Sequence, residues 1–141
     1  MYKIIVWALL IKKDKILLLK KPDNGEWTSV GGHVEDHESL KMAVCREAME
    51  ELGIKIQEEN LSLLCVIDRK LDDAYKFHVF FHASQWEGDP VNKEPDVHTD
   101  VEWYKLSNLP DNLGPLASAA IDSLDTKQLY YFRDHQEERE V

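Results

Sequence analysis

The segment Gly32–Ile54, with the sequence GHVEDHESLKMAVCREAMEELGI, carries most of the information about this protein. Its second half predicts a helix that begins after Ser39, a favourable N-cap residue, and runs to about Leu52. Gly53 is typical of the residue that ends a helix, because glycine readily adopts the left-handed conformation. Apolar side chains recur at helical spacing, so we expect one face of this helix to pack on a sheet.

Three glutamates share another face of the predicted helix. Glu47, Glu50 and Glu51 are spaced so that their carboxylates point in one direction, and Arg46 is four residues from Glu50. Like charges this close repel one another unless a cation compensates them, and carboxylates favour Mg²⁺ first and Mn²⁺ second. A solvated helix face is the alternative explanation. The pair Gly31-Gly32, which allows close backbone approach just before the helix, favours a metal site.

The spacing of these residues resembles the signature of the Nudix hydrolases, G-x5-E-x7-R-E-U-x-E-E-x-G-U, where U is a bulky apolar residue. Every charged and glycine position is matched, and only Ala48 is smaller than usual. The resemblance implies an α/β fold, a sandwich with a mixed β-sheet and a catalytic loop–helix–loop. It also implies a metal-dependent enzyme that cleaves a nucleoside diphosphate linked to another group. The matching residues are Gly32, Glu38, Arg46, Glu47, Ala48, Glu50, Glu51, Gly53 and Ile54.

The resemblance also implies a role for each matching residue. Arg46 would orient the glutamates, and Glu38 and Gly53 would support the loop–helix–loop. The metal ligands, Mg²⁺ or Mn²⁺ being the cofactor, would be the Gly32 carbonyl, Glu47, Glu50 and Glu51.

The general base differs among subfamilies of these hydrolases. It is either Glu47 or an acidic residue of the loop before the last predicted strand. That loop offers four candidates, among which the sequence does not choose: Glu94, Asp96, Asp100 and Glu102.

Substrate choice depends on residues outside the motif. Glu26-Trp27, Glu102-Trp103 and Leu109–Leu113 resemble the MutT-like branch, which acts on nucleoside triphosphates. We therefore expect a canonical, oxidised or otherwise modified (deoxy)nucleoside triphosphate to be hydrolysed to the monophosphate and pyrophosphate. A nucleotide sugar, an RNA 5′ end or another nucleoside diphosphate derivative is the enzymatic alternative. A non-catalytic nucleotide-binding module is the second alternative, although such modules typically lose a metal glutamate.

Four further residues are candidates for substrate contact. Lys20, or Lys21 beside it, can meet a phosphate as a point charge, and Trp27 can stack on a base. His33 directly follows the glycines and can reach a phosphate or base, and Asn112 can pair with a purine edge. Three of them have a plainer explanation: a solvated lysine for Lys20, a core aromatic residue for Trp27 and a turn residue for Asn112.

The length and net charge of the chain limit the number of domains and the kinds of partner that we expect. The chain has 141 residues, which indicates a single domain over 1–141, and 43% of them are hydrophobic. The net charge of −10 gives no general attraction to a nucleic-acid backbone or an anionic membrane. We therefore expect a small nucleotide substrate brought in by the metal, no long nucleic acid, no membrane partner, and a monomer or homodimer.

The rest of the chain predicts the other elements and the compartment. We expect a reducing, cytoplasmic location, because Cys45 and Cys65 are far apart in the sequence and form no CxxC pair. Both are expected to be buried thiols. The apolar run 4–11 is too short for a signal peptide or a membrane span. The tail 134–141 is nearly all charged, and we expect it to be solvated. Strands are predicted at 4–11, 16–19, 27–30, 61–67, 77–83 and 101–106, and helices at 116–124 and 128–132.

Overall fold

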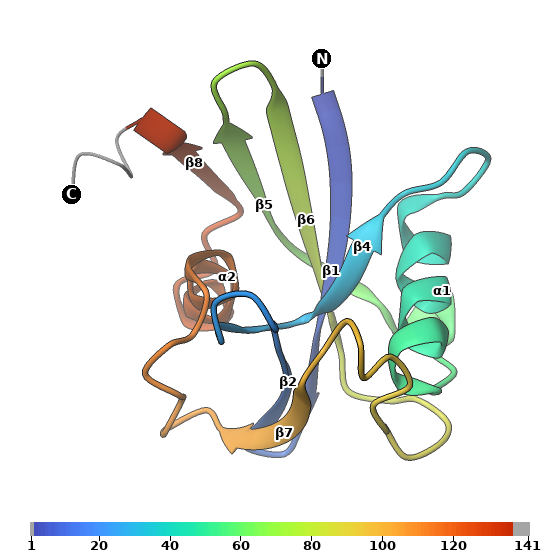
Figure 1. The fold of residues 1–141 in the computed structure, drawn as a ribbon. Helices are drawn as coiled ribbons and strands as arrows, with labels where there is room; N and C mark the ends of the chain where they lie inside the picture. Colours follow the sequence, from blue (N-terminus) through green and yellow to red (C-terminus); the bar gives the residue numbers. More distant parts are fainter. Residues whose placement is uncertain (1, 137–141) are drawn as a thin grey trace.

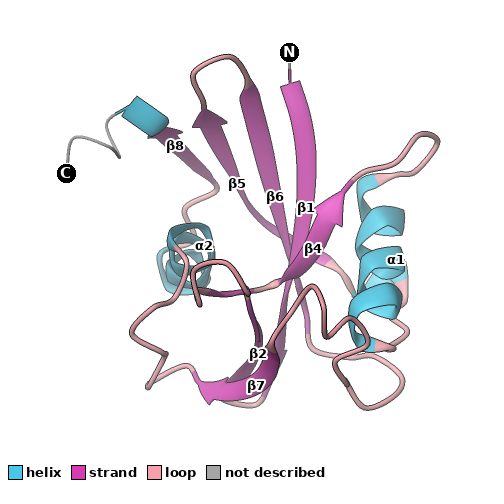
Figure 2. Ribbon diagram, viewed as in Figure 1, coloured by secondary structure: helices cyan, strands magenta, loops and turns pink. Residues whose placement is uncertain are grey.

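The computed structural model describes residues 2–136, which form a mixed sheet of eight strands between two helices (Figure 1). Helix α1 (Leu40–Leu52) covers one face of the sheet, and α2 (Pro115–Thr126) covers the other (Figure 2). The predicted α/β sandwich is confirmed. No helix among the described residues is long and apolar enough to cross a membrane. The strands are β1 (Tyr2–Lys12), β2 (Lys15–Lys20), β3 (Trp27–Thr28), β4 (Val30–His33), β5 (Ser62–Lys70), β6 (Tyr75–Ala83), β7 (Asp100–Lys105) and β8 (Tyr130–Asp134), and a 3-10 turn spans Glu58–Asn60.

Strand β1 is the centre of the sheet, because its apolar run is buried on both faces. Val6, Ala8 and Leu10 belong to the core cluster on the α1 side, whereas Leu9 and Ile11 belong to the cluster on the α2 side. β1 pairs in parallel with β6 and antiparallel with β2 and β4. The strand order is β3-β2-β1-β6-β5-β8, with β4 beside β1 and β7 beside β2. Burial on both faces confirms what the continuous apolar run predicts.

The segment that follows α2 corrects one prediction. We expect a helix over 128–132 from the sequence, but the chain forms β8 there and pairs in parallel with β5. Lys127 ends α2 with φ +62° and donates its N–H to the Ser123 carbonyl at 2.9 Å. The aromatic residues that follow favour an extended chain, and the free edge of β5 satisfies its backbone groups. Asp134 therefore ends a strand, and the rest of the expected tail, 137–141, lies outside the described residues.

The two cysteines differ in burial. Cys65 is buried in the sheet, as expected, but Cys45 is only half-buried, because it lies at the edge of the apolar face of α1. Burial raises the pKa of both thiols, so both are protonated at neutral pH. Neither forms a disulfide.

Candidate active site

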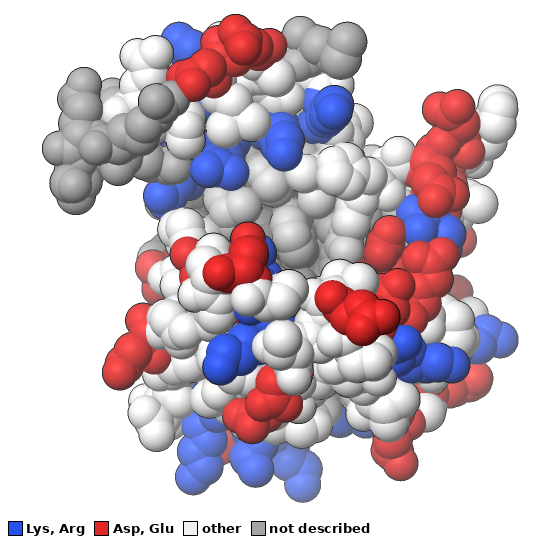
Figure 3. Space-filling model, viewed as in Figure 1, with Lys and Arg blue, Asp and Glu red and all other residues white. Residues whose placement is uncertain are grey.

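A pocket of about 950 Å³ opens between α1, the beginning of α2 and the loop that precedes β7. In Figure 3 a hollow lies at the centre of this face, and acidic side chains gather on its right. The sheet, α1, α2 and two loops all contribute to the walls. These walls include Trp7, Lys21, Ser29, Gly31, Glu47, Glu50, Glu51, Arg69, Glu94, His98 and Pro115.

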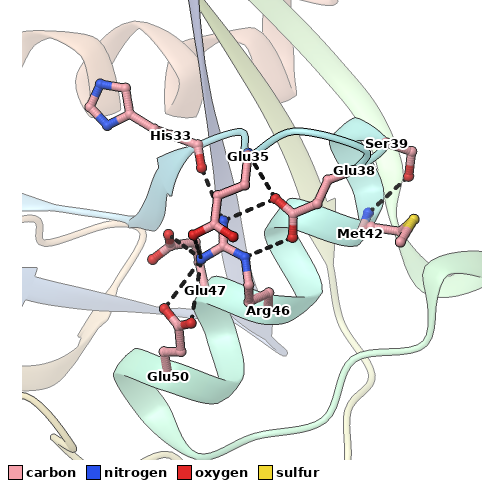
Figure 4. Close-up of polar contacts among 8 residues, drawn as sticks. All are labelled: His33, Glu35, Glu38, Ser39, Met42, Arg46, Glu47 and Glu50. Carbon is pink, nitrogen blue, oxygen red and sulfur yellow. Dashed lines mark hydrogen bonds and ion pairs between the residues drawn. The ribbon is translucent and has the colours of Figure 1, made fainter.

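The loop–helix–loop is fixed at both ends by local sequence. The Ser39 side chain accepts a hydrogen bond from the Met42 N–H at 3.1 Å (Figure 4). Gly53, with φ +69°, donates its N–H to the Met49 carbonyl at 3.0 Å and ends the helix. Both caps are those predicted from the sequence, and they set the orientation of every glutamate on α1.

The double glycine brings β4 against both the sheet and the helix. Gly31 and Gly32 are in register with Trp7 and Val6 of β1. A Cβ atom at Gly32 would lie 2.5 Å from the carboxylate of Glu47, and one at Gly31 would lie 2.2 Å from the Val6 carbonyl oxygen. Only glycine fits at Gly31, where a Cβ would overlap the backbone, whereas a Cβ at Gly32 would displace the Glu47 carboxylate from the backbone on which it packs.

Arg46 joins the carboxylates into one network (Figure 4). Its guanidinium donates to both oxygens of Glu38, with Nε–Oε2 at 2.7 Å and Nη2–Oε1 at 3.1 Å. Nη1 donates to Glu47 at 2.9 Å and to Glu50 at 3.3 Å, and Nη2 donates to the His33 carbonyl at 3.0 Å. This pairing lowers the pKa of Glu38 and raises the pKa of Arg46. Arg46 therefore sets the positions of Glu47 and Glu50, as the sequence predicts.

Glu51 is the unusual member of the group, because its carboxyl group is buried. The residue is 4% exposed, Oε1 lies 3.3 Å from Nε2 of His98, and Oε2 has no hydrogen-bond partner. Burial, and after it the neighbouring Glu47 and Glu94, together raise the pKa of Glu51 to about 10. Without a cation this carboxyl group is protonated at neutral pH.

These residues fit a hard divalent cation. The Oε2 atom of Glu51 is buried without a partner, and Glu47, Glu50 and Glu94 line the same pocket. A cation beside Glu51 would compensate the burial of its charge. Among residues 2–136, no three acidic, histidine or cysteine side chains already converge in a coordination geometry. In the absence of a cation, ion pairs with Arg46 hold one carboxylate oxygen of Glu47 and one of Glu50.

The loop that precedes β7 is tied to the end of α1. Val91 and Lys93 donate their N–H groups to the carbonyls of Leu52 and Glu51, each at 3.0 Å. The Asn92 side chain accepts from the N–H of Glu94 at 3.1 Å and donates to the carbonyl of His98 at 2.7 Å. These bonds hold Glu94 and His98 on the pocket wall.

Only one of the four acidic loop candidates lines the pocket, and it is Glu94. The side chain of Asp100 accepts from the Val101 N–H at 2.9 Å, and Glu102 accepts from the Tyr104 hydroxyl at 3.1 Å. Asp96 is exposed. Sequence spacing could not separate the four residues, because the fold of the loop decides which one faces inward.

The four candidates for substrate contact do not line this pocket. Trp27 is buried and packs edge-on against Tyr104, with ring centroids 5.1 Å apart. The Asn112 side chain donates to the carbonyl of Gly25, which holds two loops together. The His33 carbonyl accepts from Arg46, and the Lys20 ammonium lies 5.8 Å from the Trp27 ring. The plainer explanations for Trp27 and Asn112 therefore agree with their contacts.

Of the two lysines that the sequence offers for a phosphate contact, Lys21 lines the pocket. Ser29, Arg69 and His98 also line it, and the sequence analysis does not single them out. None of these three belongs to a motif, and they come from separate parts of the chain.

A family model described as the NUDIX domain matches residues 1–125. This chain belongs to the Nudix family. A solved MutT NUDIX hydrolase from Burkholderia pseudomallei superposes with a TM-score of 0.80 at 32% identity, covering 88% of this chain and 98% of that one. The MutT protein of Bacillus halodurans superposes with a TM-score of 0.78 at 24% identity, over 94% of this chain and 89% of that one, which shows the shared fold. The predicted family and fold are confirmed.

Sequence relatives agree with this assignment. The uncharacterized Nudix hydrolase YvcI of Bacillus subtilis is 51% identical over 105 residues, covering 72% of this chain and 65% of that protein. The NAD-capped RNA hydrolase NudC of Klebsiella pneumoniae is 34% identical over 103 residues, covering 71% of this chain. The chain spans only 36% to 38% of the length of the NudC relatives from Stutzerimonas stutzeri and Klebsiella pneumoniae.

Proposed function

We propose that this Nudix protein is a Mg²⁺- or Mn²⁺-dependent pyrophosphohydrolase that cleaves a nucleoside diphosphate linked to another group. The observation that carries the proposal is the buried, unpartnered oxygen of Glu51 beside Glu47 and Glu50, which Arg46 orients. A solvated helix face would not bury a carboxyl group or clamp its neighbours with a shared guanidinium. The pocket beside them, of about 950 Å³, is large enough for a nucleotide.

Each residue of the site has a distinct task in this proposal. Glu47, Glu50 and Glu51, with the Gly32 carbonyl, would hold the cation. When bound, such a cation neutralises phosphate charge and lowers the pKa of the attacking water. Arg46 keeps the carboxylates oriented before substrate arrives, and Glu94, which lines the same pocket, would accept the proton of the water. Glu47 stays the alternative base.

A nucleoside triphosphate is the leading substrate, with the monophosphate and pyrophosphate as products. The likeness to the MutT NUDIX hydrolase from Burkholderia pseudomallei, which covers nearly the whole chain at 32% identity, supports this choice. Lys21 on the pocket wall supplies a point charge for a phosphate. We propose Lys21, rather than its neighbour Lys20, for this contact.

A dinucleotide such as NAD is the second candidate, and the names of the NudC relatives favour it. Those proteins are more than twice as long as the part that matches this chain. A nucleotide sugar is a third option that the same assay covers. In all cases a small nucleotide, rather than a long nucleic acid or a membrane, is the partner that we propose, in a monomer or homodimer located in the cytoplasm.

A substrate panel tests the proposal. The purified protein with Mg²⁺ at mildly alkaline pH is given common and oxidised nucleoside triphosphates, NAD and nucleotide sugars, and products are separated by chromatography. Monophosphate and pyrophosphate from a triphosphate would support the leading candidate, and AMP with nicotinamide mononucleotide from NAD would support the second.

Two variants make the panel specific. Glu51→Gln removes a proposed metal ligand and should lower kcat by at least about a hundredfold, whereas Asp96→Asn removes an exposed charge of the nearby loop and should leave kcat unchanged. Absence of turnover, together with a nucleotide that raises the melting temperature, would overturn the enzymatic proposal in favour of a nucleotide-binding module.

A further inference from the structure

A row of cationic side chains crosses the sheet beside the pocket. Lys3 of β1 is in register with Lys76 of β6, Lys76 with Arg69 of β5, and Arg69 with Arg133 of β8. Residues in register point to the same face of a sheet, so these four side chains share one face. With about 4.8 Å between neighbouring strands, the row is about 14 Å long.

The basic row lies on the pocket side of the sheet. Trp7, four residues from Lys3, points to the same face and lines the pocket, and so does Arg69 of the row itself. Trp7 is in register with Gly31, which precedes the catalytic helix. Four residues of a strand span about 13 Å, so the row lies about that far along the sheet from the double glycine.

The charge of the basic row contrasts with the rest of the protein. The whole chain carries 27 acidic and 17 basic residues, yet four basic residues are neighbours here. In Figure 3 basic side chains gather above the central hollow, opposite the acidic ones over α1. Basic residues on four adjacent strands of one face concentrate positive charge beside the pocket.

The positive potential of the row reaches the buried part of the sheet. His78 of β6 is two residues from Lys76 and accepts a hydrogen bond at Nδ1 from the Trp7 indole at 3.0 Å. Burial first, and then the charges of Arg69 and Lys76, lower the pKa of His78 to about 4. The imidazole is therefore neutral at pH 7, and the cations of the row remain the positive groups of this wall.

We propose that the basic row binds a phosphate attached to the 3′ side of the substrate nucleoside, so that the protein prefers substrates with a phosphate at both ends of that nucleoside. This inference rests on the proposed function, which puts the scissile anhydride at Glu47, Glu50 and Glu51. A gap of about 13 Å is wide enough for one nucleoside between that anhydride and the row. Guanidinium and ammonium groups are the ones that recognise phosphate in proteins.

Two sources can supply such a 3′-phosphate. It is either the terminal 3′-phosphate of a mononucleotide or the first phosphodiester of a short oligonucleotide whose 5′ end enters the pocket. Both place the same anion on the row, and a terminal phosphate differs from a phosphodiester only in charge and in the chain that continues from it.

A binding experiment tests the proposal without requiring turnover. Dissociation constants at low salt are measured by calorimetry for adenosine 5′-monophosphate, adenosine 3′,5′-bisphosphate and a 5′-phosphorylated adenosine trinucleotide. We expect the wild-type protein to bind the bisphosphate at least about tenfold more tightly than the monophosphate, because it gains charge-assisted hydrogen bonds. The preference should fall as salt is raised. If the trinucleotide binds as tightly as the bisphosphate, the 3′-phosphate comes from an oligonucleotide end. If only the bisphosphate binds tightly, it comes from a mononucleotide.

Charge-neutral variants locate the effect. Lys3→Gln combined with Lys76→Gln should abolish the preference for the bisphosphate, with the circular dichroism spectrum unchanged. Lys70→Gln is the matched control, because Lys70 is next to Arg69 on β5 and points to the opposite face. Equal dissociation constants for the two adenosine nucleotides in the wild-type protein would overturn the proposal, as would an equal effect of Lys70→Gln. An intact preference without Mg²⁺-dependent turnover on the substrate panel would instead refute the proposed function alone.

Discussion

Replacement of Glu51 by Gln should stabilise the metal-free protein while it removes activity. The carboxyl group is 4% exposed, and burial together with Glu47 and Glu94 raises its pKa from 4.5 to about 10. Between these two values the folded protein keeps a proton that the unfolded chain has lost, so the free energy of unfolding decreases as pH rises. The decrease is about 1.36 kcal/mol for each pH unit, which amounts to about 3 kcal/mol at pH 7.

Glutamine has nearly the same shape and no charge, so its burial does not make the free energy of unfolding decrease as pH rises. Thermal unfolding followed by circular dichroism in EDTA, between about pH 5 and pH 8, measures the difference. The two proteins should have similar melting temperatures near pH 5, and Glu51→Gln should melt roughly 10 °C higher than the wild type at pH 7. Excess Mg²⁺ should then raise the melting temperature of the wild type more than that of the variant.

A matched variant separates burial from the mere loss of a charge. The side chain of Glu50 is 51% exposed, so Glu50→Gln should change the free energy of unfolding by less than about 1 kcal/mol and keep the pH dependence of the wild type. The reasoning is refuted if Glu51→Gln shows the same pH dependence as the wild type in EDTA, or if it melts at a lower temperature at pH 7.

Three further predictions concern the geometry of the site. Gly32→Ala puts a methyl group 2.5 Å from the carboxylate of Glu47, so kcat should fall at least about a hundredfold with the circular dichroism spectrum retained; an unchanged kcat would contradict this packing. Arg46→Lys cannot reproduce the bidentate pairing or reach the same set of oxygens, so urea unfolding should show a loss of about 2 kcal/mol together with a lower kcat; full retention of both would argue against the clamp. Glu94→Gln should lower kcat at least about a hundredfold in steady-state assays while Asp96→Asn leaves it unchanged, and a similar loss in both would indicate general electrostatics rather than a base.

Local sequence determined helix α1 and its closest polar contacts. Ser39 and Gly53 cap the helix by hydrogen bonds within a few residues, and helical spacing alone brings Arg46 to Glu50. These interactions depend on backbone geometry that the residues themselves prefer. They could therefore be predicted from the sequence, and the family of the chain followed from them.

Tertiary structure decided the features that need contacts between distant segments. The burial of Glu51 depends on His98 of a loop that is bonded to the end of α1, and that same loop puts Glu94 rather than its acidic neighbours on the pocket wall. The segment 128–132 became a strand because the edge of β5 was available to pair with it. The basic row likewise exists only through the register of four strands, since Lys3 and Arg133 lie at opposite ends of the sequence. No local pattern encodes such pairings, because side-chain burial and strand register are properties of the assembled sheet.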